Sequence, residues 1–216
     1  MIYFTSDLHF HHNKIREYSP VFRNYPDSES MQEALIEVWN QRVGVEDVVY
    51  NLGDFSMASS LTRIIKTARR LNGKHYLILG NHDELIRAHK EELLSMSKDD
   101  DNLLFEEIVD YKTFKAQDKQ FVLSHYPMFG WENQQHGSIM LHGHLHDHMT
   151  DLKGRILNVG YDLHGKIISI DEVIKYLKDI PQTNYRFNDK EEINRHDSVD
   201  KRKEMIRNKI ASINAV

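Results

Sequence analysis

Apolar and polar residues in the first half of the chain follow two alternating periods. Short β-branched and aromatic runs predict strands at residues 2–7, 47–53 and 75–81. Apolar residues at helical spacing predict amphipathic helices at residues 30–43, 60–71 and after Asn81. We expect Ser30 and Glu33 to open the first of these helices as a capping box. This β-α-β-α alternation indicates an α/β protein with parallel strands in its first half.

The pattern changes after the acidic segment 98–102. Apolar runs then follow one another closely and predict strands at residues 105–114, 119–126, 138–144, 154–160 and 166–170. This half therefore indicates a mostly antiparallel or mixed sheet. Ser169 and Glu172 predict a capped helix over 170–180, which Pro181 ends.

Residues 182–216 differ from residues 1–181, which we interpret as one domain. The segment is rich in charge and poor in apolar residues. Ile206, Ile210 and Ile213 lie at i, i+4 and i+7, which predicts a final amphipathic helix. Such a helix can dock on the core or mediate self-association, while a partly ordered tail is an equally supported alternative. The oligomeric state is left open.

Composition limits the chemistry that the chain can perform. Its 216 residues contain no Cys, which excludes disulfides and thiolate metal sites. The remaining ligands, mainly His, Asp, Asn and water, suit Mn, Fe, Zn, Ni or Co. A formal charge of −5 without a basic block disfavours nonspecific nucleic-acid binding. No apolar run is long enough for a membrane span and no leader pattern is seen, so we expect a cytoplasmic protein.

Potential metal ligands gather at the ends of the predicted strands. The chain has 14 histidines, and most of them lie in short clusters. In an open α/β sheet, ligands bind where the carboxyl ends of the strands meet. The side chains expected to converge there are Asp7, His9, Asp54, Asn81, His82, Asp83, His125, His144 and His146.

This mixture of carboxylate, imidazole and amide groups is typical of a two-metal site. Two divalent ions about 3.5–4 Å apart can hold both the attacking and the leaving oxygen of a phosphoryl displacement. One carboxylate must bridge the ions, since each of its oxygens can bind one ion and its charge offsets their repulsion. Neutral ligands leave the cluster positive, so it attracts a phosphate ester and lowers the pKa of bound water.

Five short blocks occur in one order along the chain: DLH (7–9), GD (53–54), GNHD (80–83), SH (124–125) and GHLH (143–146). Together they resemble the signature of the calcineurin-like metallophosphoesterases, over roughly residues 1–165. The resemblance implies an α/β fold in four αββα layers, with two mixed β-sheets flanked by helices.

The resemblance also implies a role for each matching residue. The implied ligands are Asp7, His9 and His146 for the first metal, Asn81, His125 and His144 for the second, and Asp54 as the bridge. His82 matches the catalytic histidine that protonates the leaving oxygen, and Asp83 beside it would tune or orient that histidine. Two divalent metals, with Mn first among the candidates, are the implied cofactors.

Departures from the signature narrow the branch of the family. Asp54 is followed by Phe55 and not by the D-R-G segment of protein Ser/Thr phosphatases, and the third block is GNHD, not GNHE. The compact GHLH block is similar to that of phosphodiesterases and nucleases. Residues 6–15 and 158–165 resemble small bacterial and phage phosphoesterases. His12 and Asn13 are candidate substrate contacts, although a local turn or helix cap explains them equally well.

These observations predict a dinuclear metal-dependent phosphoesterase in which a metal-bound hydroxide attacks phosphorus. A phosphodiester or nucleotide-type substrate is favoured over a phosphoprotein. A DNA or RNA nuclease is the alternative enzyme, although the low basicity counts against it. A catalytically silent scaffold is the alternative from another class, and it is disfavoured because every ligand is retained.

The histidines of residues 142–148 occupy every second position and need separate roles. If His144 and His146 are ligands, we expect the backbone to leave strand geometry near Gly143, where the missing Cβ permits a turn. His142 would then be a buried residue of the strand. His148 would be solvated or lie at the rim of the pocket.

Overall fold

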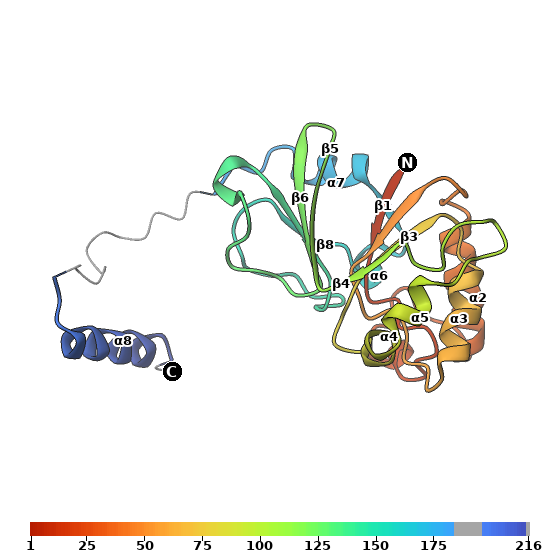
Figure 1. Cartoon of the computed structure of the whole chain (residues 1–216), viewed down its shortest axis with the longest axis horizontal. Coiled ribbons are helices and arrows are strands. Elements are labelled where there is room, and N and C mark those ends of the chain that lie inside the picture. Colours follow the sequence, from red (N-terminus) through yellow and green to blue (C-terminus); the bar gives the residue numbers. More distant parts are fainter. Residues whose placement is uncertain (184–195, 215–216) are drawn as a thin grey trace. The chain divides into compact units, whose positions relative to one another are not determined.

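The structure is a computed structural model that describes residues 1–183 and 196–214. The chain divides into two compact units, Met1–Thr183 and Asn184–Val216 (Figure 1). The first unit carries two β-sheets and the candidate ligands, and the second carries the helix α8 (Val199–Ile213).

The first β-sheet contains the strands that the β-α-β-α pattern predicts. Its order is β4-β3-β2-β1-β9. Its parallel strands are β1 (Ile2–Thr5), β2 (Val48–Asn51), β3 (Lys74–Ile78) and β4 (Glu107–Val109). The short β9 (Ile168–Ser169) pairs antiparallel with β1. The predicted parallel pairing is confirmed, and it places the carboxyl ends of β1, β2 and β3 at one edge.

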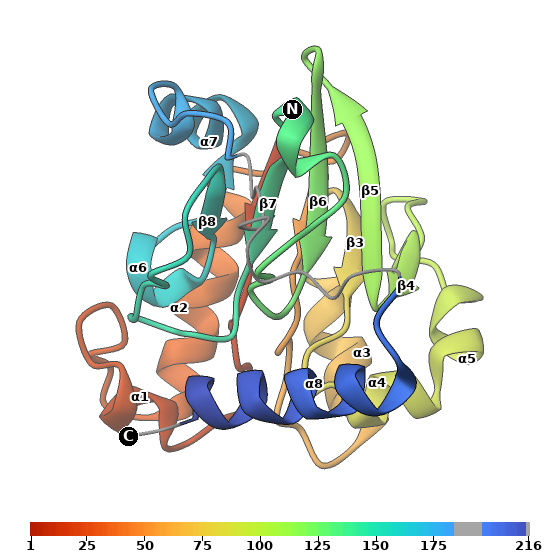
Figure 2. The ribbon, with the colours of Figure 1, turned by 90° about the vertical axis from the view of Figure 1, so that its left-hand side faces the viewer.

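The second β-sheet is mixed and has the order β5-β6-β7-β8. β5 (Tyr111–Ala116) and β6 (Lys119–Ser124) form an antiparallel hairpin. β7 (Ile139–His142) and β8 (Ile156–Asn158) extend the sheet by parallel pairing (Figure 2). The carboxyl ends of β6 and β7 therefore point the same way, so the groups that follow them can converge.

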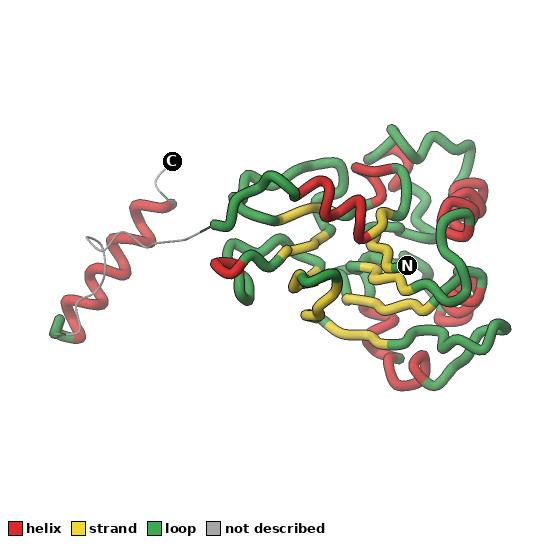
Figure 3. Tube along the Cα trace, turned by 90° about the horizontal axis from the view of Figure 1, so that it is seen from above, coloured by secondary structure: helices red, strands yellow, loops and turns green. Residues whose placement is uncertain are grey.

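Strand alternation divides the apolar residues of the first sheet between its two faces. Val49 and Leu77 face the helices, where they share one apolar cluster with Trp39. Tyr50 faces the second sheet and belongs to a cluster with Phe121. The helices of the outer layer are α2 (Ser28–Asn40), α3 (Leu61–Arg69), α4 (Glu84–Ala88) and α5 (Lys90–Leu94), which gather on one side of the sheets (Figures 1 and 3).

The layer beyond the second sheet is thinner. Trp131 from the loop after β6 packs there on Val122 and Met140, and much of the surrounding chain is loop (Figure 3). The remaining helices are α1 (Ile15–Tyr18), the 3₁₀ helix η1 (Gln134–His136), α6 (Tyr161–His164) and α7 (Ile170–Leu177). The predicted fold class, two mixed sheets flanked by helices, is confirmed, with most of the helical layer on one side.

Two predictions about helix ends have different outcomes. The predicted capping box of Ser30 and Glu33 is wrong, because α2 begins earlier and its N-cap is Asp27. The Asp27 carboxylate accepts a hydrogen bond from the Ser30 N–H at 2.7 Å. The box of Ser169 and Glu172 at α7 is confirmed, with both of its hydrogen bonds present. Asp and Ser are both good N-caps, so sequence alone does not choose between Asp27 and Ser30.

Two predicted elements are each divided in the structure. The helix expected after Asn81 is split between α4 and α5 at His89, which has the non-helical angles φ −116° and ψ 24°. The strand expected at 105–114 contributes β4 to the first sheet and β5 to the second. Strand-forming residues occur on both sides of Asp110, so the sequence does not reveal that the chain changes sheets there.

The C-terminal unit contains the predicted amphipathic helix as α8, capped by Ser198, which accepts from the Lys201 N–H. Ile206, Ile210 and Ile213 are exposed, so docking of this stripe stays a prediction. Residues 184–195 and 215–216 of the predicted extension lie outside the described residues. Among the described helices, none has the length and apolar character needed to cross a membrane.

Candidate metal centre

The loops after β1, β2 and β7 have an unusual backbone. Several of their non-glycine residues have left-handed φ angles between 49° and 71°, namely Asp7, His9, Asp54, His144 and His146. Such a conformation costs on the order of 1–3 kcal/mol for a non-glycine residue and clusters at functional sites. The three loops come together at the edge where the strands end, and they present their polar side chains to one another.

Asp83 fastens the loops of the first sheet to each other. Its carboxylate accepts hydrogen bonds from the backbone N–H groups of Asp54, Phe55 and Gly80, each at 2.9 Å. Burial raises the pKa of Asp83 to about 6, although these N–H donors favour the charged form. The carboxylate thus has an anchoring task that the sequence did not predict, and its expected influence on His82 stays a prediction.

Two glycines allow the backbone segments to approach closely. A Cβ on Gly80 would lie 2.3 Å from Asp54 Oδ1, and a Cβ on Gly143 would lie 1.8 Å from Ser6 Oγ. The chain leaves β7 at His142, just before Gly143, as predicted. Glycine is required at position 143 because the backbone there lies against the side chains of Ser6 and Asp7, which leave no space for a Cβ.

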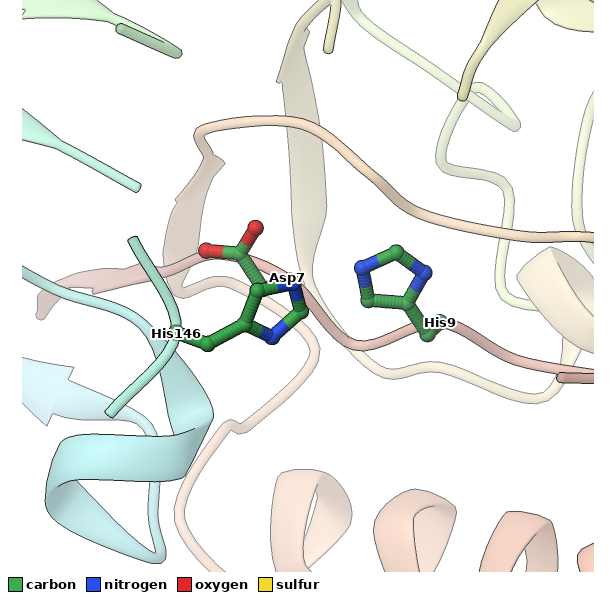
Figure 4. Close-up of side chains that lie close together, drawn as sticks. All are labelled: Asp7, His9 and His146. Atoms are coloured by element: carbon green, nitrogen blue, oxygen red, sulfur yellow. The ribbon is translucent and has the colours of Figure 1, made fainter. Parts of the chain in front are cut away.

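The first group of candidate ligands consists of Asp7, His9 and His146, whose ligand atoms lie within 4.8 Å of one another (Figure 4). Asp7 and His9 follow β1, and His146 comes from the loop after β7. Within the described part of the chain, neither ring nitrogen of His9 has a hydrogen-bond partner, although both are buried. A buried imidazole without a partner, facing a carboxylate, fits a metal ion.

The second group forms around Asn81. Its Oδ1 lies 3.0 Å from His125 Nε2 and 3.0 Å from His144 Nδ1. His125 Nδ1 lies 2.7 Å from the backbone carbonyl of Leu52 and donates to it, so Nε2 carries the electron pair that can bind a metal. The three residues implied for the second metal are therefore brought together.

Asp54 lies between the two groups. Its Oδ2 is 3.5 Å from Nε2 of His9, and 3.5 Å from Nε2 of His125. Its Oδ1 accepts from the backbone N–H of His82 at 2.8 Å. Asp54 can therefore contribute one carboxylate to both groups.

Electrostatics favour a cation among these residues. Burial raises the pKa of Asp7 to about 7, which shows that its charge is poorly stabilised by the protein alone. Burial also lowers the pKa of His9 and of His125, which keeps the imidazoles neutral and able to bind metal. A carboxylate whose charge is poorly stabilised, next to neutral imidazoles, is a donor set that suits a divalent metal.

His82 stands between the ligands and open space. Its ring centroid is 5.4 Å from that of His9, and its side chain is exposed. It also lines a hollow of about 550 Å³, together with residues 56–59 and the first residues of α4. The imidazole of His82 therefore has open space beside it.

The two candidate substrate contacts differ in position. The His12 N–H donates to the His9 carbonyl at 3.1 Å, and its ring centroid is 5.4 Å from that of His9. His12 therefore forms the local turn and also faces the ligands. Asn13 lines a separate hollow of about 670 Å³, whose wall includes Arg63 and Lys66.

The two other histidines of residues 142–148 are placed as expected. His142 is fully buried, and its Nδ1 lies 2.8 Å from the Gly143 carbonyl. His148 has an exposed side chain that pairs with Asp147 at 2.9 Å.

Three further residues outside the predicted ligand set lie at this edge. The ring of Tyr126 is 4.6 Å from that of His144, so this exposed aromatic side chain lies beside the second ligand group. Arg23 and Asp162 are buried and bonded to each other behind His146. Arg23 lies outside any apolar run, so the spacing of apolar residues does not indicate that it is buried. Asp162 lies in the segment 158–165 that resembles phosphoesterases.

Comparison with known proteins agrees with this geometry. The model of the calcineurin-like phosphoesterase family matches residues 1–200, so the chain belongs to this family of metal-dependent phosphoester hydrolases. It is 32% identical to the Gene 66 protein of Mycobacterium phage D29, covering 84% of this chain and 98% of that protein. A protein of unknown function from Aquifex aeolicus has a similar structure, with a TM-score of 0.62 and 25% identity over 82% of this chain and 98% of that one.

Proposed function

We propose that the chain is a dinuclear phosphoesterase that cleaves a phosphodiester or nucleotide-type ester. The observation that carries the proposal is the position of Asp54 Oδ2, at 3.5 Å from a ring nitrogen in each ligand group. A carboxylate between two groups of candidate ligands is the arrangement expected of a bridge between two cations.

In this proposal the first metal is held by Asp7, His9 and His146, and the second by Asn81, His125 and His144, with Asp54 shared. The nitrogen and oxygen ligands suit Mn²⁺, and they also accept Fe, Zn, Ni or Co. When bound, two such ions neutralise the phosphoryl oxygens and lower the pKa of water.

The protein's own part is to position the substrate and to supply a proton. His82 borders the hollow that accepts the leaving group, and its imidazole protonates the leaving oxygen. His12, whose ring also lies next to that of His9, contacts the phosphate or the atoms next to it. Tyr126 offers an exposed ring beside His144, on which a base can stack.

The test is hydrolysis of bis(p-nitrophenyl) phosphate by Mn²⁺-loaded protein, compared with Asp54→Asn. We expect cleavage by the wild type and loss of at least about 100-fold in kcat/KM in the variant, since a shared ligand matters more than residues behind ligands, which typically contribute 10–100-fold. Asp151→Asn, at an exposed loop position, is the control for the same change of charge. Absence of cleavage, or an unaffected Asp54→Asn enzyme, would contradict the proposal.

A panel of substrates then defines the class of ester. Linear diesters, cyclic nucleotides, dinucleotides, monoesters and single-stranded nucleic acid are compared at equal phosphate concentration. The proposal expects a small diester or nucleotide to be the best substrate. A long nucleic acid that is cleaved far faster than any nucleotide would instead identify a nuclease.

A further inference from the structure

A buried arginine and a buried aspartate stand directly behind the first ligand group. Arg23 lies in the irregular segment between α1 and α2 and is 0% exposed. Asp162 lies in the first turn of α6 and is also buried. Arg23 Nε donates to Asp162 Oδ1 at 2.5 Å, and Nη2 reaches Asp162 Oδ2 at 3.2 Å. The pair therefore has the geometry of a two-point guanidinium–carboxylate contact.

The aspartate of this pair also contacts a candidate ligand. Asp162 Oδ2 lies 2.8 Å from His146 Nδ1. An N–H on Nδ1 that donates to this carboxylate leaves Nε2 as the free electron pair of the ring. The carboxylate thereby fixes both the tautomer and the orientation in which His146 can bind a metal, as carboxylates behind metal-bound histidines commonly do.

The arginine of the pair also holds the strained loop after β1. Arg23 Nη1 donates to the Leu8 carbonyl at 2.9 Å, and Nη2 donates to the carbonyl of Asp7. Asp7 and His9, on either side of Leu8, have left-handed φ angles of 56° and 49°. One guanidinium therefore connects the backbone that presents two ligands to the carboxylate that orients the third.

The second ligand group is supported differently. His125 donates from Nδ1 to the backbone carbonyl of Leu52, and the carboxylate that lies against its Nε2, that of Asp54, belongs to the candidate site itself. The two ligand groups share Asp54, and the His144 N–H donates to the Asp7 carboxylate, so they are linked, but the buried pair lies directly behind the first group alone. A change in the buried pair should therefore weaken the first metal position more than the second.

We propose that Arg23 and Asp162 are positioning residues that set the affinity of the first metal position through His146 and the loop after β1. This inference rests on the proposed two-metal function. A buried ion pair is a poor source of stability, because removing two charges from water costs about as much as their attraction returns. Its orienting effect on metal ligands gives this pair a purpose that an apolar pair of similar size would not serve.

The test measures Mn²⁺ binding by titration calorimetry and by electron paramagnetic resonance, which separates a single Mn²⁺ from a coupled pair. We expect two ions in the wild type. In Asp162→Asn we expect one ion to bind about 10–100-fold more weakly, with loss of the coupled spectrum at limiting metal and a smaller loss of affinity for the other ion. Asp110→Asn is the matched control, because Asp110 makes an equivalent two-point contact with Arg87 at the surface.

A double variant, Arg23→Met with Asp162→Asn, keeps the test decisive if Asp162→Asn leaves an unpaired charge and fails to fold. The double variant should remain folded by circular dichroism and still bind the first ion weakly. If either folded variant binds both ions as tightly as the wild type, the positioning role is refuted. If the wild type itself binds Mn²⁺ but never yields a coupled pair, the two-metal function fails instead, and the effect of Asp162→Asn on the single ion still decides the positioning role.

Discussion

Two regions of the molecule bury a histidine whose ring nitrogens have no hydrogen-bond partner among the described residues. His9 lies at the edge where the strands end, beside the carboxylates of Asp7 and Asp54. His75 lies in the core between the first sheet and the helices. Its ring centroid is 5.1 Å from that of Trp39 and 4.7 Å from that of Phe105.

The comparison shows that burial alone does not identify a metal ligand. Burial lowers the pKa of both histidines, to about 3 for His75 and well below the usual range for His9. The neighbours decide the function. Carboxylates next to a neutral imidazole create a place for a cation, whereas aromatic rings offer only packing.

The same two regions also differ in backbone conformation. His9 is in a left-handed conformation, and its backbone N–H donates a hydrogen bond to the Asp54 carbonyl at 3.0 Å. His75 is an ordinary residue of β3, paired in register with Val49. The strained backbone thus occurs where side chains must converge, and the regular backbone occurs where they need only pack.

The largest expected effect comes from removing His82, which adjoins His9 at the edge. In His82→Ala, kcat for a diester with an alkyl leaving group should fall about 10²–10⁴-fold, because the leaving oxygen loses its proton donor. Bis(p-nitrophenyl) phosphate should be affected much less, since p-nitrophenolate leaves without a proton. Steady-state kinetics with both esters check this, with His89→Ala as control. Equal losses for both esters would rule out the acid role.

Removal of His9 should weaken the metal site directly. In His9→Ala we expect Mn²⁺ affinity to fall by at least about 10–100-fold, the range found even for groups behind a ligand. Calorimetric titration of metal-free protein with Mn²⁺ measures the effect. His75→Leu is the matched control at the other buried histidine and should bind Mn²⁺ normally. Unchanged affinity in His9→Ala would remove His9 from the ligand set.

The sequence predicted the candidate metal ligands better than the residues that hold those ligands in place. Asp7, Asp54, Asn81 and His144 follow strands that their own apolar patterns reveal, and parallel pairing brings such strand ends together. Arg23 and Asp162 are separated by 139 positions and have no spacing in common. Their contact depends on how the loops fold over the strand ends, which local patterns do not encode.

The same limit applies to the fold. Strand positions and the parallel order of β1, β2 and β3 were predictable, because each strand is locally apolar and each crossover is helical. The passage from β4 to β5 at Asp110 was not, since the pattern runs on while the pairing partner changes from β3 to β6. Sheet membership is set by long-range packing.

Substitution of His75 should change stability without changing activity. Its pKa of about 3 in the folded chain, against 6.5 when unfolded, means that the unfolded chain takes up the proton first as the pH falls below 6.5. This residue should therefore cost the wild type about 2 kcal/mol of unfolding free energy between pH 7 and pH 5, a loss that His75→Leu avoids. Urea unfolding of metal-free protein at both pH values measures it. Parallel pH profiles for the two proteins would contradict the prediction.

Glu172 lies outside both regions, and its substitution should have the smallest effect on stability. This effect changes at a more acidic pH than the effect of His75. Partial burial would raise its pKa, but the Lys166 ammonium, the Ser169 backbone N–H and Arg42 together lower it to about 2, against 4.5 when unfolded. Its stabilising contribution is thus complete above pH 4.5 and disappears as the pH falls toward 2. Glu172→Gln keeps an oxygen for the capping box, and it should lose only about 1 kcal/mol at pH 7 because solvent screens the pairs.

Urea unfolding from pH 7 to pH 3 distinguishes this effect from that of His75. The difference between wild type and Glu172→Gln should narrow below pH 4.5, whereas the difference for His75→Leu develops between pH 6.5 and pH 5. Glu91→Gln, at an exposed position of α5, should follow the wild type at every pH. If Glu172→Gln also removed the loss of unfolding free energy between pH 7 and pH 5, that loss could not be assigned to the buried His75. The two regions would then differ only in their backbone conformation and in the neighbours of their histidines.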